Sequence, residues 1–167
     1  MEKLYLALYE WECNVYLASN GESLIRAGFD YDRIVSDLKK NFPACRIVCD
    51  PSKLKTPLRQ LEEYFQGKRT VFDVPVQLHG TPFQINVWHE VKKILYGQTD
   101  TYGNIAKKLG DVRLSRAVGR AVGANPIPLF IPCHRVIGTN GWPGGYLGGS
   151  AVKKRLLALE AREARQP

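Results

Sequence analysis

Apolar and polar side chains alternate over the first part of the chain, a pattern typical of β-strands. Residues 3–9 and 13–18 are rich in aromatic and branched apolar side chains, and the short polar segment between them predicts a hairpin. Asn20 and Gly21 form a second turn signal, so residues 22–27 are expected to form a third strand.

The apolar spacing then becomes helical. Residues 31–41 place apolar side chains on one face of a predicted helix, which Asp30 is expected to cap. A short apolar strand is expected over 46–49, and a second amphipathic helix is expected to end at Gly67. Residues 71–78 again look like a strand. These elements predict a small sheet with helices packed on it.

From Thr81 onward the pattern is helical and interrupted by turn residues. Thr81 and Gln84 can form a capping box around Pro82, so a helix is predicted to begin there. Two short helices follow, over 102–109 and 116–124, with Thr101 and Ser115 as the expected caps. Two short helices joined by a tight turn, the second of them basic, have the outline of a helix-turn-helix.

An apolar segment over 127–137 and a glycine-rich loop over 138–149 lead to a final helix, which Ser150 is expected to cap. Loops rich in glycine let the backbone approach a ligand closely. The sequence therefore predicts a two-domain α+β protein. Residues 1–78 are expected to form the sheet-and-helix domain and residues 79–167 the helical domain.

Charge strengthens this division. The formal net charge is +8, and all of it lies in residues 81–167, which contain 13 Lys and Arg but 5 Asp and Glu, whereas residues 1–80 contain 11 of each sign. This excess fits either a solvated basic surface or a polyanionic partner such as nucleic acid. The chain has neither an apolar stretch long enough for a membrane span nor a signal-peptide pattern, so a cytoplasmic protein is expected.

The chain has four cysteines, which is too few for a disulfide framework at this length. Cys45 and Cys49 are close enough in sequence to pair or to share a metal ion, and both possibilities stay open. No second pair of Cys or His at a suitable spacing supports a metal site. Neither a metal nor a cofactor is predicted.

Cys133 is the candidate nucleophile. His134 and Arg135 follow it directly, and nearby positive charge favours the reactive thiolate by lowering the thiol pKa. Adjacent side chains need not touch, so a buried structural cysteine is the alternative interpretation of these three residues alone.

The segment around Cys133 closely resembles the active-site motif of the O6-alkylguanine-DNA alkyltransferases. The resemblance implies a ribonuclease H-like N-terminal domain and a winged-helix-like DNA-binding domain. It extends over residues 72–161 and is carried by these segments: 125–136 with the core Pro132-Cys133-His134-Arg135-Val136, 80–84, Thr101-Tyr102-Gly103, 115–119, 145–149, and Lys153, Leu156, Leu157 and Glu160.

The family resemblance implies single-turnover DNA repair. Cys133 is expected to take the alkyl group from O6-alkylguanine, and less efficiently from O4-alkylthymine, in double-stranded DNA, which inactivates the protein irreversibly. His134, held by Glu160, is expected to deprotonate the thiol through a water molecule. Tyr102 is expected to donate a hydrogen bond to guanine N3, which helps the guanine to leave.

The resemblance also assigns the pocket for guanine. The carbonyl group of Val136, with that of the catalytic cysteine, is expected to accept from the exocyclic amine, which adenine lacks. Asn125 is expected to tie the preceding turn to the active-site segment. Tyr146 belongs to the glycine-rich loop, the lid of the family, and Leu147 stands where the family often has serine, so a hydroxyl contact is lost. Lys153 is assigned to the same pocket.

DNA contacts are expected mainly from the predicted recognition helix. The target nucleotide must leave the base stack, and Arg116 is expected to fill the vacated space. The expected partner is double-stranded DNA with O6-alkylguanine, bound by a monomer in the cytoplasm, at the nucleoid or in a nucleus. The other residues expected to contact DNA are Ser115, Ala117, Arg120, Tyr102 and Arg135.

Two other functions fit part of the pattern. A non-catalytic sensor of alkylated guanine has the same fold, but such proteins lack the cysteine. A helix-turn-helix regulator with a sensing cysteine predicts a dimer and a palindromic site, and no dimerisation segment is evident.

Overall fold

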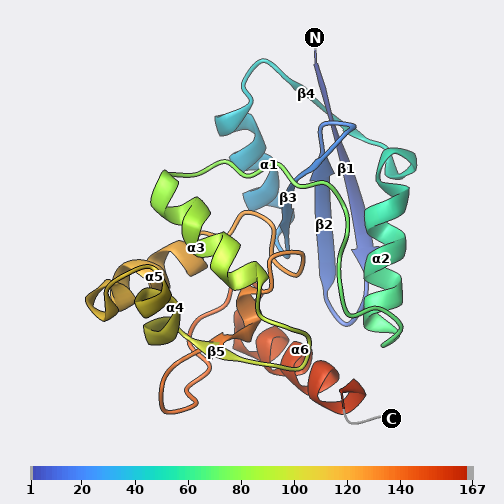
Figure 1. Cartoon of the computed structure of the whole chain (residues 1–167). Helices are drawn as coiled ribbons and strands as arrows, with labels where there is room; N and C mark the ends of the chain where they lie inside the picture. The colour runs from blue at the N-terminus through green and yellow to red at the C-terminus, as the bar shows by residue number, and fades with distance from the viewer. Residues whose placement is uncertain (1, 165–167) are drawn as a thin grey trace. The chain divides into compact units, whose positions relative to one another are not determined.

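The computed structural model describes residues 2–164 and divides into two compact units, Met1–Leu78 and His79–Pro167. Figure 1 shows a sheet with helices in the first unit and mostly helices in the second. The architecture is α+β, as the hydrophobic pattern predicts.

The sheet of the first unit has the strand order β3-β2-β1-β4. Strand β1 (Lys3–Glu10) pairs antiparallel with β2 (Asn14–Ser19), which pairs antiparallel with β3 (Leu24–Gly28). Strand β4 (Arg46–Cys49) lies parallel to β1 on the other side. The predicted hairpin and the two further strands are therefore confirmed.

The helices of the first unit also follow the prediction. Helix α1 (Tyr31–Asn41) begins where Asp30 accepts a hydrogen bond from the backbone N–H of Arg33. Helix α2 (Lys55–Phe65) continues from a 3-10 turn, η1 (Pro51–Leu54). Side chains from α1 and from the strands form one apolar core, which contains Leu4, Leu6, Ala18, Ile25, Ile34 and Leu38.

The predicted strand over 71–78 is wrong. Only one isolated bridge forms there, between Val76 and Leu24. The N–H of Leu24 donates to the carbonyl of Pro75, and the N–H of Gln77 donates to the carbonyl of Leu24, each at 2.9 Å. Pro75 itself has no N–H to donate, which is consistent with pairing that does not extend along the segment.

Over residues 79–164, the second unit contains six helical segments and one short two-stranded sheet. Strand β5 (Asp100–Thr101) pairs parallel with β6 (Val136–Ile137), which directly follows the 3-10 turn η3 (Cys133–Arg135). This pairing brings the start of helix α4 next to the cysteine segment. The helical segments are α3 (Pro82–Lys92), α4 (Tyr102–Lys108), the 3-10 turn η2 (Val112–Leu114), α5 (Ser115–Gly123), η3 and α6 (Gly149–Glu163).

Two of the four helix caps predicted for the second unit are present. Thr81 and Gln84 form the capping box at the start of α3, with Pro82 as the first helical residue. Thr101 accepts a hydrogen bond from the N–H of Asn104 at 3.1 Å, which caps α4.

The two predicted serine caps are wrong. Ser115 is already the first residue of α5, and its hydroxyl donates back to the carbonyl of Val112. The cap lies earlier, because Asp111 accepts from the N–H of Arg113 at 2.8 Å and so begins η2, which runs directly into α5. Helix α6 begins at Gly149, before Ser150, without a side-chain cap.

A buried tryptophan joins α3 to α5. Trp88 is 2% exposed, and its indole N–H donates to the carbonyl of Ala121 at 2.8 Å. The inward face of α5 is apolar, with Val118 and Val122 buried. This packing fixes α5 and leaves its charged face exposed.

Within residues 2–164, no helix is long and apolar enough to cross a membrane. Cys45 and Cys49 are both free thiols, so the disulfide that their spacing left open is absent.

Candidate active site

The segment before Cys133 is a buried turn held by Asn125. The Asn125 side chain accepts from the N–H of Ile127 at 3.0 Å and donates to the carbonyl of Ile131 at 2.8 Å. Leu129 adopts a φ of 75°, which is uncommon for a residue with a branched side chain. Asn125 thus bridges to the backbone six positions later and fixes the segment that leads into η3.

Cys133 lies at the start of η3 and is 3% exposed. Burial raises the pKa of its thiol to about 11, although contacts with Asn125 and Lys153 act in the opposite direction. The prediction of a lowered thiol pKa from flanking positive charge is therefore wrong. The thiol is protonated at neutral pH, so a nucleophilic sulfur needs a base that removes the proton during reaction.

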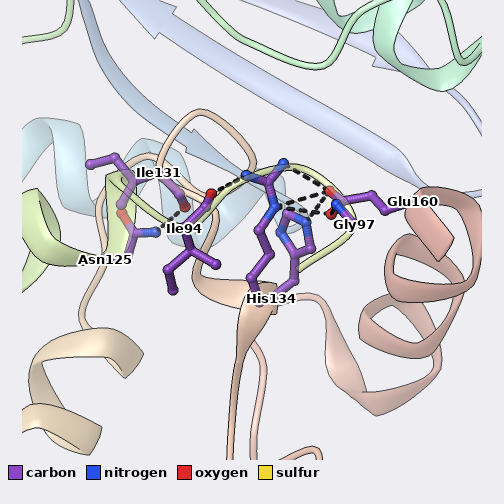
Figure 2. A network of polar contacts seen from close by, with 7 residues as sticks. Ile94, Gly97, Asn125, Ile131, His134 and Glu160 are labelled. Carbon is purple, nitrogen blue, oxygen red and sulfur yellow. Dashed lines mark hydrogen bonds and ion pairs between the residues drawn. The ribbon is translucent and has the colours of Figure 1, made fainter. Parts of the chain in front are cut away.

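His134, which follows Cys133 in η3, is the imidazole at this site. It is fully buried, and its Nε2 lies 2.7 Å from Oε1 of Glu160, which projects from α6 (Figure 2). Burial lowers the pKa of His134 and outweighs the opposite effect of Glu160. The neutral imidazole with its proton on Nε2 donates to Glu160, which leaves Nδ1 as the nitrogen with a lone pair.

Arg135 does not reach solvent, so the predicted DNA contact of this residue is wrong. Its side chain is turned inward and is 6% exposed. Nε donates to Oε2 of Glu160 at 2.9 Å, Nη2 donates to Oε1 at 3.0 Å, and Nη1 donates to the carbonyl of Ile94 at 2.6 Å. All three nitrogens of the guanidinium are therefore used inside the protein.

Gly97 completes the surroundings of the Glu160 carboxylate and was not predicted as a site residue. Its N–H donates to Oε2 of Glu160 at 3.1 Å. Its φ is +75°, and a Cβ at this position would lie 2.7 Å from Cβ of Ala164. Burial acts to raise the pKa of Glu160, but the contacts with His134 and Arg135 together lower it to about 2. Glu160 is therefore an ionised carboxylate with a fixed orientation.

Tyr102 begins α4, immediately after β5. Burial raises the pKa of its phenol and the nearby Cys133 adds to this effect, so the hydroxyl stays protonated and can donate a hydrogen bond. The glycine-rich loop touches this hydroxyl, because a Cβ on Gly144 would lie 2.6 Å from the Tyr102 oxygen. In the same loop the Tyr146 ring lies 6.3 Å from the His134 ring, edge to face, and Leu147 is partly buried beside it.

Lys153 is a fully buried cation on α6. Its ammonium group donates to the carbonyl of Val136 at 2.7 Å, and burial lowers its pKa. The carbonyl that was expected to accept from guanine thus already accepts from Lys153. A carbonyl oxygen has two lone pairs, so one remains for a ligand.

The exposed side of α5 carries Arg116 and Arg120, while Ala117 is partly buried. Two arginines four positions apart lie on one face of a helix. The small residues Ala117 and Gly119 lie between them, which lets the backbone of this helix approach a partner closely.

Comparison with known proteins agrees with this geometry. The family model for the 6-O-methylguanine DNA methyltransferase DNA-binding domain matches residues 82–162, and the model for the ribonuclease-like domain of the same proteins matches residues 4–78. The inducible methylated-DNA–protein-cysteine methyltransferase of Bacillus subtilis is 41% identical over 161 residues, which cover 94% of this chain and 88% of that protein. The Methanosarcina acetivorans methyltransferase is 41% identical over 157 residues, which cover 94% of this chain and 98% of that protein.

Solved structures give the same result. The O6-methylguanine methyltransferase of Mycobacterium tuberculosis matches with a TM-score of 0.85 and 36% identity, covering 98% of this chain and 95% of that one. A structure of the Mycobacterium tuberculosis protein in complex with DNA matches with a TM-score of 0.84 and 36% identity. The match covers 95% of this chain and 94% of that one.

A ribonuclease-like domain followed by a DNA-binding domain is the domain pair of the 6-O-methylguanine DNA methyltransferases, a class of DNA repair proteins. The chain belongs to the methylated-DNA–protein-cysteine methyltransferase family. The predicted family, fold class and enzyme class are confirmed.

Proposed function

We propose that this protein repairs double-stranded DNA by transferring the methyl group of O6-methylguanine to the sulfur of its own Cys133, once per molecule. The observation that carries the proposal is the buried series Cys133, His134 and Glu160, in which the last two are 2.7 Å apart. A carboxylate that orients the imidazole of the residue directly after a buried thiol is suited to nucleophilic catalysis.

In the proposed reaction the thiol proton passes through a water molecule to Nδ1 of His134. The sulfur then attacks the methyl carbon, the bond between that carbon and O6 breaks, and its electron pair remains on guanine. Tyr102 donates a hydrogen bond to guanine N3 and so stabilises the negative charge of the leaving base. The product is a thioether at Cys133, and thioethers are stable, so the protein acts once.

Selectivity for guanine is proposed to come from backbone carbonyls that accept from its exocyclic amine. The second lone pair of the Val136 carbonyl is available for this bond, since Lys153 takes only one. Thymine has no such amine, so transfer from O4-alkylthymine is expected to be less efficient. Asn125 contributes by fixing the segment that carries these carbonyls.

DNA is proposed to bind to α4 and α5, which act as a helix-turn-helix, with the flipped nucleotide entering through the minor groove. The target oxygen lies within the base stack, so the nucleotide must rotate out before Cys133 can reach it. Arg116 fills the vacated space, and Ser115, Ala117 and Arg120 contact the backbone nearby. The protein acts as a monomer, which size-exclusion chromatography with light scattering tests.

The experiment that tests the proposed function is intact-mass spectrometry after incubation with a methylated duplex. The protein mass is expected to increase by one methyl group, and peptide mapping is expected to locate it on Cys133. An unchanged mass, with a stable dimer on a palindromic duplex, would favour a regulator instead.

Affinity for duplex DNA is expected to depend strongly on salt and weakly on sequence. All of the +8 net charge lies in residues 81–167, and counterions released from DNA make log K fall with log salt at about 0.9 per phosphate neutralised. Fluorescence anisotropy of a labelled duplex over a salt series measures this slope. A slope near zero would contradict the proposed DNA-binding surface.

Substitution of Gly144 by alanine is expected to slow transfer from free O6-benzylguanine by roughly tenfold, equivalent to about 1.4 kcal/mol. The new Cβ would lie 2.6 Å from the Tyr102 oxygen and displace either the hydroxyl or the loop. Gly141→Ala is the matched control, because Gly141 has a similar φ of +78° and no atom lies within 4 Å of its Cβ. Equal slowing in both variants would assign the effect to backbone strain rather than to Tyr102.

A further inference from the structure

The carboxylate of Glu160 is surrounded by donors in the interior of the second unit. Oε1 accepts from His134 Nε2 at 2.7 Å and from Arg135 Nη2 at 3.0 Å. Oε2 accepts from Arg135 Nε at 2.9 Å and from the N–H of Gly97 at 3.1 Å. Each oxygen therefore has both lone pairs engaged, and the carboxylate can neither rotate nor exchange partners without a loss. Figure 2 shows Gly97, His134 and Glu160 gathered in this network.

Arg135 has a second anchor that fixes its own position. Its Nη1 donates to the carbonyl of Ile94, just beyond the end of α3, at 2.6 Å. The guanidinium also lies 5.7 Å from the ring centre of Tyr96. Arg135 thus connects the segment after α3 with η3 and α6.

We propose that Arg135 is a positioning residue that keeps His134 in the neutral, proton-accepting state by balancing the charge of Glu160. The inference rests on the proposed function, because it concerns the base of that reaction. A lone carboxylate 2.7 Å from an imidazole favours the imidazolium, which cannot take a proton from a thiol. A guanidinium paired with the same carboxylate opposes that influence and acts in the same direction as the burial of the imidazole.

The other charges around His134 support this balance. Burial is the largest influence and disfavours the imidazolium, Glu160 favours it, and the two cations Arg135 and Lys153 disfavour it. Removal of Arg135 takes away the guanidinium that pairs with Glu160 and leaves His134 beside an unbalanced carboxylate. The titratable groups near this site are Cys133 and Arg135 on η3, Lys153 and Glu160 on α6, Tyr146 on the glycine-rich loop and Tyr96 after α3.

The protonation state matters because the thiol is a weak acid here. Burial raises the pKa of Cys133 to about 11, so transfer needs a neutral His134 to accept the proton. The rate of transfer is therefore expected to fall as the pH drops through the pKa of His134. Any change that raises the pKa of His134 moves the acid limb of the pH–rate profile to higher pH.

The first test compares Arg135→Gln with Arg135→Lys, using second-order rates with free O6-benzylguanine from pH 5 to pH 9. Arg135→Gln removes the charge and is expected to move the acid limb up by about one pH unit or more. The rate at pH 7 then falls roughly tenfold and recovers at high pH. Arg135→Lys keeps the charge but loses the bidentate contact with Glu160. The acid limb of this variant is expected to stay at the same pH, and the rate on the high-pH plateau is expected to be lower.

Arg162→Gln is the matched control. Arg162 lies on α6 two residues after Glu160, its side chain is 71% exposed, and its loss changes the net charge equally. The acid limb of this variant is expected to coincide with that of the unsubstituted protein. A rate that falls by the same factor at every pH in Arg135→Gln would show that Arg135 only supports the fold, and it would overturn the proposal.

The second test uses the unsubstituted protein, because removal of one partner of a buried ion pair destabilises the folded state. Nitrogen NMR of the imidazole groups is expected to show His134 with its proton on Nε2 and a pKa below the ordinary value of about 6.5. A pKa of His134 at or above that value would overturn the proposal. This measurement needs no alkyl transfer, so it separates failure of this inference from failure of the proposed function, which the absence of benzyl transfer at every pH would reveal.

Discussion

Replacement of Cys133 by alanine is expected to abolish alkyl transfer while the affinity for DNA stays close to that of the unsubstituted protein. The sulfur is the only nucleophile proposed for the reaction, and it lies on η3, 3% exposed. The arginines proposed to contact DNA lie on the exposed side of α5 instead. Intact mass after incubation with a methylated duplex measures transfer, and fluorescence anisotropy of the same duplex measures binding.

Cys49→Ala is the matched control for this prediction. Cys49 is an exposed free thiol at the end of β4, in the other unit of the chain. This variant is expected to gain one methyl group like the unsubstituted protein. A methyl group gained by the Cys133→Ala variant would place the acceptor elsewhere and contradict the assignment of Cys133.

Local sequence patterns predicted most of the helices and strands because these depend on neighbouring residues. Asp30 caps α1 and Thr81 caps α3 as expected, since both use side chains within three residues of the helix start. The errors arise where a nearby residue determines the local backbone structure in place of the residue that was expected to do so. Asp111 begins a 3-10 turn that runs into α5, so Ser115 is already helical, and Pro75 lies in the segment that was expected to form a strand.

The site was predicted only in part, because its geometry depends on residues far apart in the sequence. The motif around Cys133 identified the cysteine and His134, and the family resemblance supplied Glu160. It gave no indication that Gly97, 63 residues before Glu160, would donate to its carboxylate. It also gave no indication that Arg135 would turn inward to the carbonyl of Ile94, 41 residues away. A glycine that ends a helical pattern and an arginine next to a nucleophile each have a more common explanation.

The predicted effect on the Cys133 pKa had the wrong sign for a related reason. Proximity in sequence suggested that the positive charge of Arg135 would act on the thiol. In the structure Arg135 pairs with Glu160, and burial of the thiol dominates. Burial depends on how distant segments pack, so a tripeptide cannot reveal it. The consequence is mechanistic, because a protonated thiol makes the reaction depend on His134.

Replacement of Arg116 by alanine is expected to slow repair of a methylated duplex roughly thirtyfold and to leave the reaction with free O6-benzylguanine nearly unchanged. Extrusion of a nucleotide costs a few kcal/mol of stacking and pairing. Arg116 is exposed on the first turn of α5, where a side chain can occupy the space that the nucleotide leaves. Loss of about 2 kcal/mol of that compensation lowers the flipped population by roughly thirtyfold, since about 1.4 kcal/mol is tenfold.

Arg120→Ala provides the comparison that separates this role from charge alone. It removes the same charge from the same helix four positions later, so it is expected to weaken binding to every duplex and to recover at low salt. The Arg116 variant is expected to remain slow on duplex DNA at low salt, even when the duplex is saturating. Equal slowing of the Arg116 variant on duplex and on free base would mean that Arg116 supports the pocket, and its role in nucleotide flipping would be wrong.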